Sequence, residues 1–133
     1  MNLLIGIDPG TNTGLAVWGQ GELLLVKSGT AVEVESYILD RLKTHGVKLR
    51  IEDARKRTWF GKAGRERLKG VGSVNRDCSR WQEFLEHHEI EFSMIHPKNN
   101  RTKLSAFEFK RLTGWAGRTN DHARDAAMLI YQG

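Results

Sequence analysis

The stretch that decides the fold lies at residues 3–18 and reads LLIGIDPGTNTGLAVW. A continuous apolar run ends at Asp8, and Pro9, Gly10 and Gly14 then mark a turn before a second apolar run. An uninterrupted apolar run is typical of a strand that is buried on both faces. Aspartate is a poor strand former, and its charge is costly to bury unless it is paired or binds a cation. Asp8 is therefore either an ordinary turn residue after the strand or part of a site.

Length and composition favour a single domain spanning 1–133. The chain has 133 residues, enough to bury one core, and a formal net charge of +5. Its one cysteine excludes an internal disulfide, and no Cys/His spacing suggests a zinc site. The sequence shows neither a secretory leader nor an apolar run long enough to span a bilayer. We therefore expect a soluble protein in a reducing compartment, without a membrane partner.

Apolar periodicity predicts alternating strands and helices along the chain. Short apolar runs separated by turns predict an antiparallel meander of three strands, and a 3.6-residue period predicts helices further on. The predicted strands cover residues 3–8, 14–19, 22–29, 47–53 and 90–96, and the predicted helices cover residues 31–44, 71–88, 102–112 and 121–131. Residues 53–70 show no clear period and are predicted to form a long loop. The order βββαβαβαα is typical of an α/β fold in which helices flank a five-stranded mixed sheet, antiparallel over its first three strands and parallel for the fourth and fifth.

Two of the predicted helices carry apolar stripes. The stripe of the helix at 71–88 favours packing against its own sheet. Its residues are Val71, Val74, Cys78, Trp81 and Leu85. The apolar positions of the helix predicted at 102–112 are Leu104, Phe107 and Leu112.

Two carboxylates stand at the ends of predicted strands. Asp8 ends the first strand, and Glu52 lies at the end of the fourth. If the helix at 31–44 is a crossover between parallel neighbours, both carboxylates emerge at the carboxyl edge of the sheet, where open α/β sheets bind ligands. Because Asp53 follows Glu52, a solvated acidic pair at a strand end is the alternative interpretation.

The last predicted helix carries three further candidate groups, in the segment NDHARDA at 120–126. Asp121, His122 and Asp125 are three or four residues apart and so share one helical face. Two alternatives stay open: Asp121 caps its helix or complements the helix dipole, and His122 is an ordinary surface histidine.

Carboxylates that converge on one point predict a cation. They repel one another, and their pKa values rise unless a cation neutralises them. Hard oxygen ligands without cysteine favour Mg²⁺ or Mn²⁺. Two such ions, about 3.5–4 Å apart, can activate a water and stabilise the leaving oxygen in phosphodiester hydrolysis. We therefore predict a metal site formed by Asp8, Glu52 and Asp125, with Asp121 as a further candidate ligand.

The chain resembles the RuvC-type Holliday junction resolvases of the RNase H-like superfamily, in particular a short phage version. The resemblance covers nearly the whole chain and rests on the motifs GIDPGTNTGLAVW, IED, GVGSVNRDCSRW and DHARDAAMLI. It implies that two Mg²⁺, for which Mn²⁺ can substitute, are held by Asp8, Glu52, Asp125 and the residue three before Asp125. That residue is His122 here, and family members carry Asp or His at this position, whereas Asp121 has no family counterpart.

The same resemblance implies basic residues after the fifth strand, for which Lys98 and Lys103 are the matching candidates. Lys103 is the candidate for stabilising the charge that develops on the phosphate during cleavage. Chaperone and sugar-kinase ATPases begin with a similar acidic Gly/Thr turn, but they need two such domains, so we expect no nucleotide cofactor.

Positive charge is concentrated in two segments, as nucleic-acid binding requires. Together the segments 55–69 and 98–111 hold 12 of the 21 Lys and Arg residues. Trp59 and Phe60 lie within the first segment and are candidates for stacking on unpaired bases. A solvated charged face is the alternative interpretation. The predicted DNA-binding residues are Arg55, Lys56, Arg57, Trp59, Phe60, Lys62, Arg65, Arg67, Lys69, Lys98 and Arg101.

The resemblance and the residues together predict a Mg²⁺-dependent endonuclease that cuts four-way DNA junctions by paired symmetric hydrolysis. Such an enzyme is expected to act as a homodimer, in the cytoplasm of a bacterial or phage-infected host cell. The alternatives are an RNase H-like nuclease acting on RNA or RNA/DNA hybrids and a nucleic-acid-binding domain of the same fold that does not cut.

Overall fold

The computed structural model describes residues 2–56 and 65–133, with residues 56 and 65–74 described by their backbone alone. Its elements are β1 (Asn2–Asp8), β2 (Thr13–Gly19), β3 (Glu22–Gly29), α1 (Ala31–Leu42), β4 (Gly46–Glu52), the 3₁₀ turn η1 (Ala54–Lys56), α2 (Arg65–His87), β5 (Glu91–Ile95), the 3₁₀ turn η2 (Pro97–Asn99), α3 (Ala106–Thr113) and α4 (Asp121–Met128). The strands form one sheet in the order β3-β2-β1-β4-β5. The pairs β1–β4 and β4–β5 are parallel, and the other two pairs are antiparallel. The predicted α/β fold with a five-stranded mixed sheet is confirmed.

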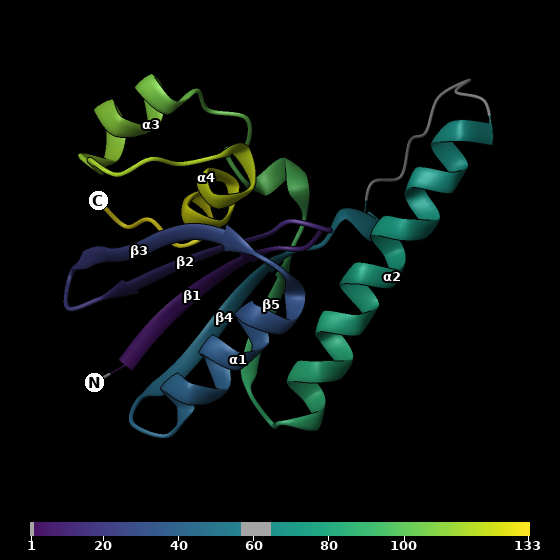
Figure 1. The fold of residues 1–133 in the computed structure, drawn as a ribbon, viewed down its shortest axis with the longest axis horizontal. Helices are drawn as coiled ribbons and strands as arrows, with labels where there is room; N and C mark the ends of the chain where they lie inside the picture. The colour runs from purple at the N-terminus through teal and green to yellow at the C-terminus, as the bar shows by residue number, and fades with distance from the viewer. Residues whose placement is uncertain (1, 57–64) are drawn as a thin grey trace.

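Helices cover the sheet on both faces (Figure 1). On one face α1 and α2 pack over a core that includes Ile5, Ile38 and Trp81. On the other face α4 lies across β1 and β2, and α3 lies beyond it, in a second core that includes Ala126 and Phe109. The central strand β1 is thereby enclosed between two layers, as its continuous apolar run predicts.

The contact between α4 and the sheet is unusually close because glycines lie beneath the helix. A Cβ on Gly6 would lie 2.2 Å from the carbonyl oxygen of Ala126, and a Cβ on Gly14 would lie 1.9 Å from that of His122. The helix side of the contact is built from alanines, of which Ala123 and Ala126 are buried. Gly6 and Gly14 therefore set how near the backbone of α4 comes to β1 and β2.

Helix α2 begins earlier than its apolar stripe predicts. It starts at Arg65, so the prediction of a loop as far as residue 70 is wrong for its last six residues. Arg, Glu, Leu and Lys in RERLK are strong helix formers, and helix formation there follows intrinsic propensity rather than an apolar period. The inward packing of the stripe is confirmed for Cys78, Trp81 and Leu85, all of which are buried.

Among the helices that the structure describes, none combines the length and the apolar character needed to cross a membrane.

Helix α3 begins later than predicted and turns a different side chain into the core. Ser105 caps it, accepting a hydrogen bond from the backbone of Glu108 while the Glu108 carboxylate accepts one from the backbone of Ser105. The helix therefore covers Ala106–Thr113, not 102–112. Its buried residue is Phe109, whereas Phe107, predicted on the apolar face, is 73% exposed. Helix α4 ends at Met128 rather than at residue 131.

We predict that Gly14→Ala destabilises the protein by about 2–4 kcal/mol, because the new methyl group would overlap the backbone of α4. Urea unfolding followed by circular dichroism measures the change. Gly10→Ala is the control, since its Cβ would lie 3.2 Å from the nearest atom, in the turn after β1. Equal stability of Gly14→Ala and Gly10→Ala would contradict the close helix-to-sheet contact.

Candidate functional site

Two carboxylates reach the same edge and the same face of the sheet. Ile7 of β1 pairs with Ile51 of the parallel strand β4, so Asp8 and Glu52 follow at one level on neighbouring strands. Gly6, two residues before Asp8, lies beneath α4. Arg50, two residues before Glu52, donates from its guanidinium to the carbonyl oxygen of Leu129, at the end of α4. Because side chains alternate along a strand, Asp8 and Glu52 both lie on the face that α4 covers. The predicted convergence of these two acids is confirmed.

The first turns of α4 bring a histidine and a third carboxylate to this edge. Asn120 caps the helix by accepting a hydrogen bond from the backbone of Ala123 at 2.9 Å. The ring Nδ1 of His122 lies 3.3 Å from Oδ2 of Asp8. Asp125, one turn further, accepts a hydrogen bond from the backbone N–H of Lys103 at 2.9 Å. The His-x-x-Asp spacing thus directs both groups of α4 toward the strand ends.

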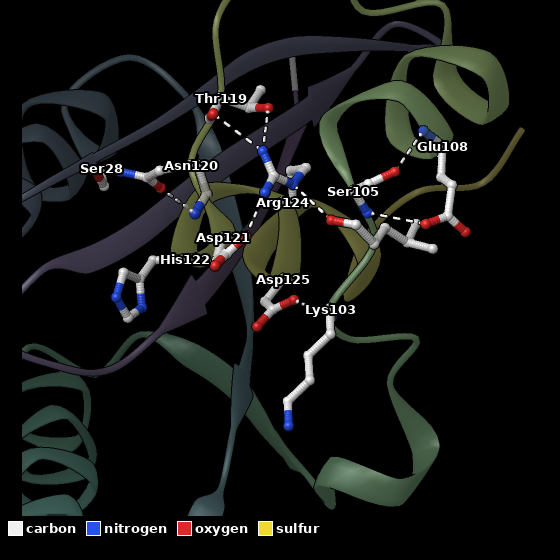
Figure 2. Close-up of polar contacts among 12 residues, drawn as sticks. Ser28, Lys103, Ser105, Glu108, Thr119, Asn120, Asp121, His122, Arg124 and Asp125 are labelled. Atoms are coloured by element: carbon white, nitrogen blue, oxygen red, sulfur yellow. Dashed lines mark hydrogen bonds and ion pairs between the residues drawn. The ribbon is translucent and has the colours of Figure 1, made fainter.

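These groups line one open cavity of about 520 Å³. It lies between the carboxyl edge of the sheet and the amino ends of α3 and α4, where Figure 2 shows Asp121, Asp125 and Lys103 close together. All six residues predicted as catalytic or metal-binding contribute to it. The lining residues are Asp8, Pro9, Glu52, Ala54, Lys103, Leu104, Ser105, Glu108, Asp121, His122 and Asp125.

Negative charge is concentrated and partly buried in this cavity. Burial and the neighbouring charges of Glu52 and Asp125 raise the pKa of Asp8 to about 7, although the bond to His122 acts in the opposite direction. Burial also raises the pKa of Asp125, while the N–H of Lys103 lowers it. Glu52 is only 5% exposed. The site therefore holds acids whose charged forms are costly without a positively charged ligand.

Asn100 is a site residue that the sequence analysis missed. Its side-chain Nδ2 donates to Oε2 of Glu52 and to the backbone carbonyl of Asp125, both at 3.1 Å. Both partners are acceptors, so the amide must present its NH₂ group to them. Asn100 thereby ties the end of β4 to α4. No sequence signal could have found it, because asparagine is common in loops and its two partners are distant in the chain.

Arg124 is a second residue that the sequence analysis missed. It is 7% exposed and donates to the backbone carbonyl of Leu104, to the carbonyl and hydroxyl oxygens of Thr119, and to the carboxylate of Asp121 (Figure 2). Its guanidinium fixes the segment before α3 and the segment before α4 to each other. A buried arginine satisfied in this way is a structural element of the site wall.

Asp121 serves neither as the cap of α4 nor as an unpaired acid. The cap is Asn120, and Asp121 occupies the first turn of the helix with its carboxylate bonded to Arg124. Its position still complements the helix dipole, as one of the alternative interpretations holds. Asp121 lines the cavity, but its side chain is 77% exposed, far more than that of Asp8.

The donor set suits Mg²⁺ or Mn²⁺ in chemistry and charge, since it consists of carboxylates and one imidazole. In residues 2–56 and 65–133, however, no group of three or more His, Cys, Asp or Glu side chains is arranged to hold a metal ion. Two of the carboxylates are instead held by nitrogen donors, Glu52 by Asn100 and Asp125 by Lys103. Cation binding would therefore require these side chains to rearrange.

The predicted DNA-binding residues differ in what they contact. The Arg55 guanidinium forms an ion pair with the buried Asp53, at 2.7 Å, and donates to Gln82 and Ser79 of α2. These bonds give Arg55 a structural role, fastening η1 to α2. Lys98 and Arg101 are exposed in the segment between β5 and α3.

The remaining DNA-binding predictions stay predictions. Arg57, Trp59, Phe60 and Lys62 lie outside the described residues. Lys56 belongs to η1, and Arg65, Arg67 and Lys69 belong to the first turns of α2, where the structure describes the backbone alone.

Comparison with models of known protein families finds no match, and a search of curated proteins finds no significant match.

We predict that Asp8→Asn stabilises the metal-free protein at pH 8. In the folded state the pKa of Asp8 is about 7, against 3.8 for an ordinary aspartate. The stability that this raised pKa contributes is fully present below pH 4 and is lost as the pH rises through 7. At pH 8 in EDTA the variant should therefore be more stable than the wild type by about 2–4 kcal/mol, and at pH 4 the two should be nearly equal.

Thermal unfolding in EDTA and in Mg²⁺ measures this difference. Mg²⁺ should raise the melting temperature of the wild type and have much less effect on Asp8→Asn. A variant that is less stable than the wild type at both pH values would show instead that the Asp8 carboxylate is a structural partner of His122.

Proposed function

We propose that this protein is a metal-dependent endonuclease of the RNase H-like fold that cuts four-way DNA junctions. The observation that carries the proposal is the convergence of Asp8, Glu52 and Asp125 on one cavity, together with the rise in the pKa of Asp8. Acids in this state at the carboxyl edge of a sheet are typical of a site that takes a cation. The family resemblance of the sequence supplies the reaction and the substrate.

Asp8, Glu52, His122 and Asp125 are the proposed ligands of two Mg²⁺ per active site. When bound, these ions would supply an activated water and stabilise the leaving oxygen of the phosphodiester. Asp8 and Glu52 come from the rigid centre of the sheet, and His122 and Asp125 come from a capped helix packed closely on it. The backbones that carry the four ligands are thus held close together, and only the side chains need to rearrange to give the accurate positioning that phosphoryl transfer requires.

Lys103 is the proposed source of positive charge beside the reacting phosphate. Its backbone N–H is bonded to Asp125, and its side chain extends away from the Asp125 carboxylate (Figure 2). The backbone of Lys103 adopts a φ of 62°, a left-handed conformation that is uncommon for lysine. Lys103 is exposed, and its backbone is anchored next to Asp125, so its ammonium can reach a phosphate that the cation also binds.

The exposed basic residues of the segment between β5 and α3 are proposed to hold the DNA backbone. Contacts to phosphates position a nucleic acid without reading its sequence, and they make binding sensitive to salt. A junction-cutting enzyme would then select its substrate by shape. Two symmetric cuts require two active sites, so the proposal includes a homodimer.

We predict that Asp8→Asn or Asp125→Asn abolishes cleavage of a synthetic four-way junction in Mg²⁺ and leaves junction binding intact. The acids serve the chemistry, whereas the phosphate contacts come from basic residues elsewhere. Gel assays of cleavage and fluorescence anisotropy of binding measure the two properties. Loss of binding in step with activity would show that these acids are structural.

Matched duplex and RNA/DNA hybrid substrates separate the alternatives in the same assay. Cleavage of the hybrid or of RNA in preference to the junction would favour an RNase H-like nuclease acting on RNA. Tight binding to the junction without cleavage, in either Mg²⁺ or Mn²⁺, would favour a nucleic-acid-binding domain that does not cut.

We predict a solution mass close to twice 15.1 kDa by light scattering at micromolar concentration. The reason is that paired nicks at a junction need one active site for each nicked strand. A protein that stays monomeric both alone and on a junction would contradict the dimer and would favour the RNA-processing alternative.

A further inference from the structure

The side chain of Phe107 is directed away from the core on α3. It is 73% exposed, the largest exposed fraction among the large apolar side chains that the structure describes. Phe109, two residues later, is buried in the core beneath the same helix. A helix this short, capped at both ends by Ser105 and Gly114, cannot rotate to bury both rings. The exposure of Phe107 is therefore fixed by the burial of Phe109.

Two basic residues lie on the same face of α3 as this exposed ring. Lys110 and Arg111 lie three and four residues after Phe107, so all three share one face of α3. Both are exposed, and neither forms an ion pair with any residue that the structure describes. The one acid in α3, Glu108, is engaged with Ser105 in the capping interaction, and Arg101 lies near enough to contribute to lowering its pKa.

The same helix borders the acidic cavity. Ser105 and Glu108, on either side of Phe107 in the sequence, both line that cavity. Phe107 itself does not line the cavity, so a polynucleotide strand with a phosphate at the acids would reach the ring by running over α3. An aromatic ring with flanking cations is what proteins use to bind unpaired nucleotides, since bases stack on the ring and phosphates contact the cations.

We propose that the face of α3 formed by Phe107, Lys110 and Arg111 binds an unpaired DNA segment next to the cleavage site, with a base stacked on Phe107. The proposal rests on the proposed function and deepens it by naming a second contact with the substrate. A contact with another copy of the chain is the competing occupant of this face. The free positive charge of Lys110 and Arg111 favours the nucleic acid.

The test compares Phe107→Leu with Phe107→Tyr in EDTA, where no cleavage occurs. Leucine keeps an apolar side chain but removes the ring, whereas tyrosine keeps the ring. The probe is a four-way junction with a short unpaired segment at its centre that carries 2-aminopurine, whose fluorescence falls when it stacks. Phe107→Leu should weaken binding about 5-fold or more and restore the fluorescence, while Phe107→Tyr should behave like the wild type.

Two further variants complete the test: a control at another exposed apolar position, and a double substitution of the two basic residues. Val32→Ala changes another exposed apolar side chain, on α1, and should leave binding and fluorescence unchanged. Replacing Lys110 and Arg111 together by glutamine should reduce the slope of log binding constant against log salt by about 2. All of these positions are exposed, so melting temperatures should stay within a few degrees of the wild type.

Unchanged binding and quenching in Phe107→Leu would overturn the proposal. If Phe107→Ala lowers the solution mass from dimer to monomer and leaves DNA stacking unaltered, the face is a contact between copies of the chain. That result would also overturn the proposal. Cleavage is measured separately on the wild type. A protein that shows the Phe107-dependent stacking but never cuts would refute the proposed function while the DNA-binding face of α3 stands.

Discussion

The close seating of α4 on β1 and β2 is the constraint on which the candidate site depends. Gly6 and Gly14 leave no side chain between the sheet and the backbone of the helix. The carbonyl oxygens of Ala126 and His122 in α4 therefore lie directly against the strands. At this distance His122 reaches Asp8, and Asp125 adds its charge to that of Asp8. A larger residue at either glycine would lift the helix and separate the groups of the site. The opening motif thus supplies both an acid, Asp8, and the space that brings the other groups to it.

This geometry brings carboxylates that repel one another together at the carboxyl edge of the sheet. Burial and two neighbouring carboxylates hold the pKa of Asp8 near 7. The hydrogen bonds that Asn100 and Lys103 give to Glu52 and Asp125 satisfy those acids only in part, because a neutral N–H donor carries no full positive charge. A cation would relieve the repulsion more completely than these donors do. The acids are therefore tolerated at a cost to stability, as is common where function competes with folding.

The core of this site could be predicted because it follows from local patterns and topology. Asp8 ends a continuous apolar run, Glu52 ends a strand of alternating apolar residues, and the helical crossover between the two strands makes them parallel. Asn100 and Arg124 could not be predicted, since their partners are fixed only by tertiary packing. The sequence places Phe107 on the apolar face of the helix predicted at 102–112 because that helix includes Leu104, which precedes the Ser105 cap and lies outside α3. Once α3 begins at Ala106, Phe109 becomes its buried anchor.

The segment from Asn100 to Ser105 connects the acids to α3, and this connection gives α3 a defined place relative to the site. Asn100 bonds to Glu52, the N–H of Lys103 bonds to Asp125, and the carbonyl of Leu104 accepts from Arg124. Ser105 then caps α3 directly. Three anchoring points, at Asn100, Lys103 and Leu104, leave this segment little freedom to move independently of the strands and α4. A nucleotide bound on α3 would consequently be held at a fixed position with respect to a phosphate at the acids, which is the condition for substrate contacts outside the reacting centre to favour cleavage.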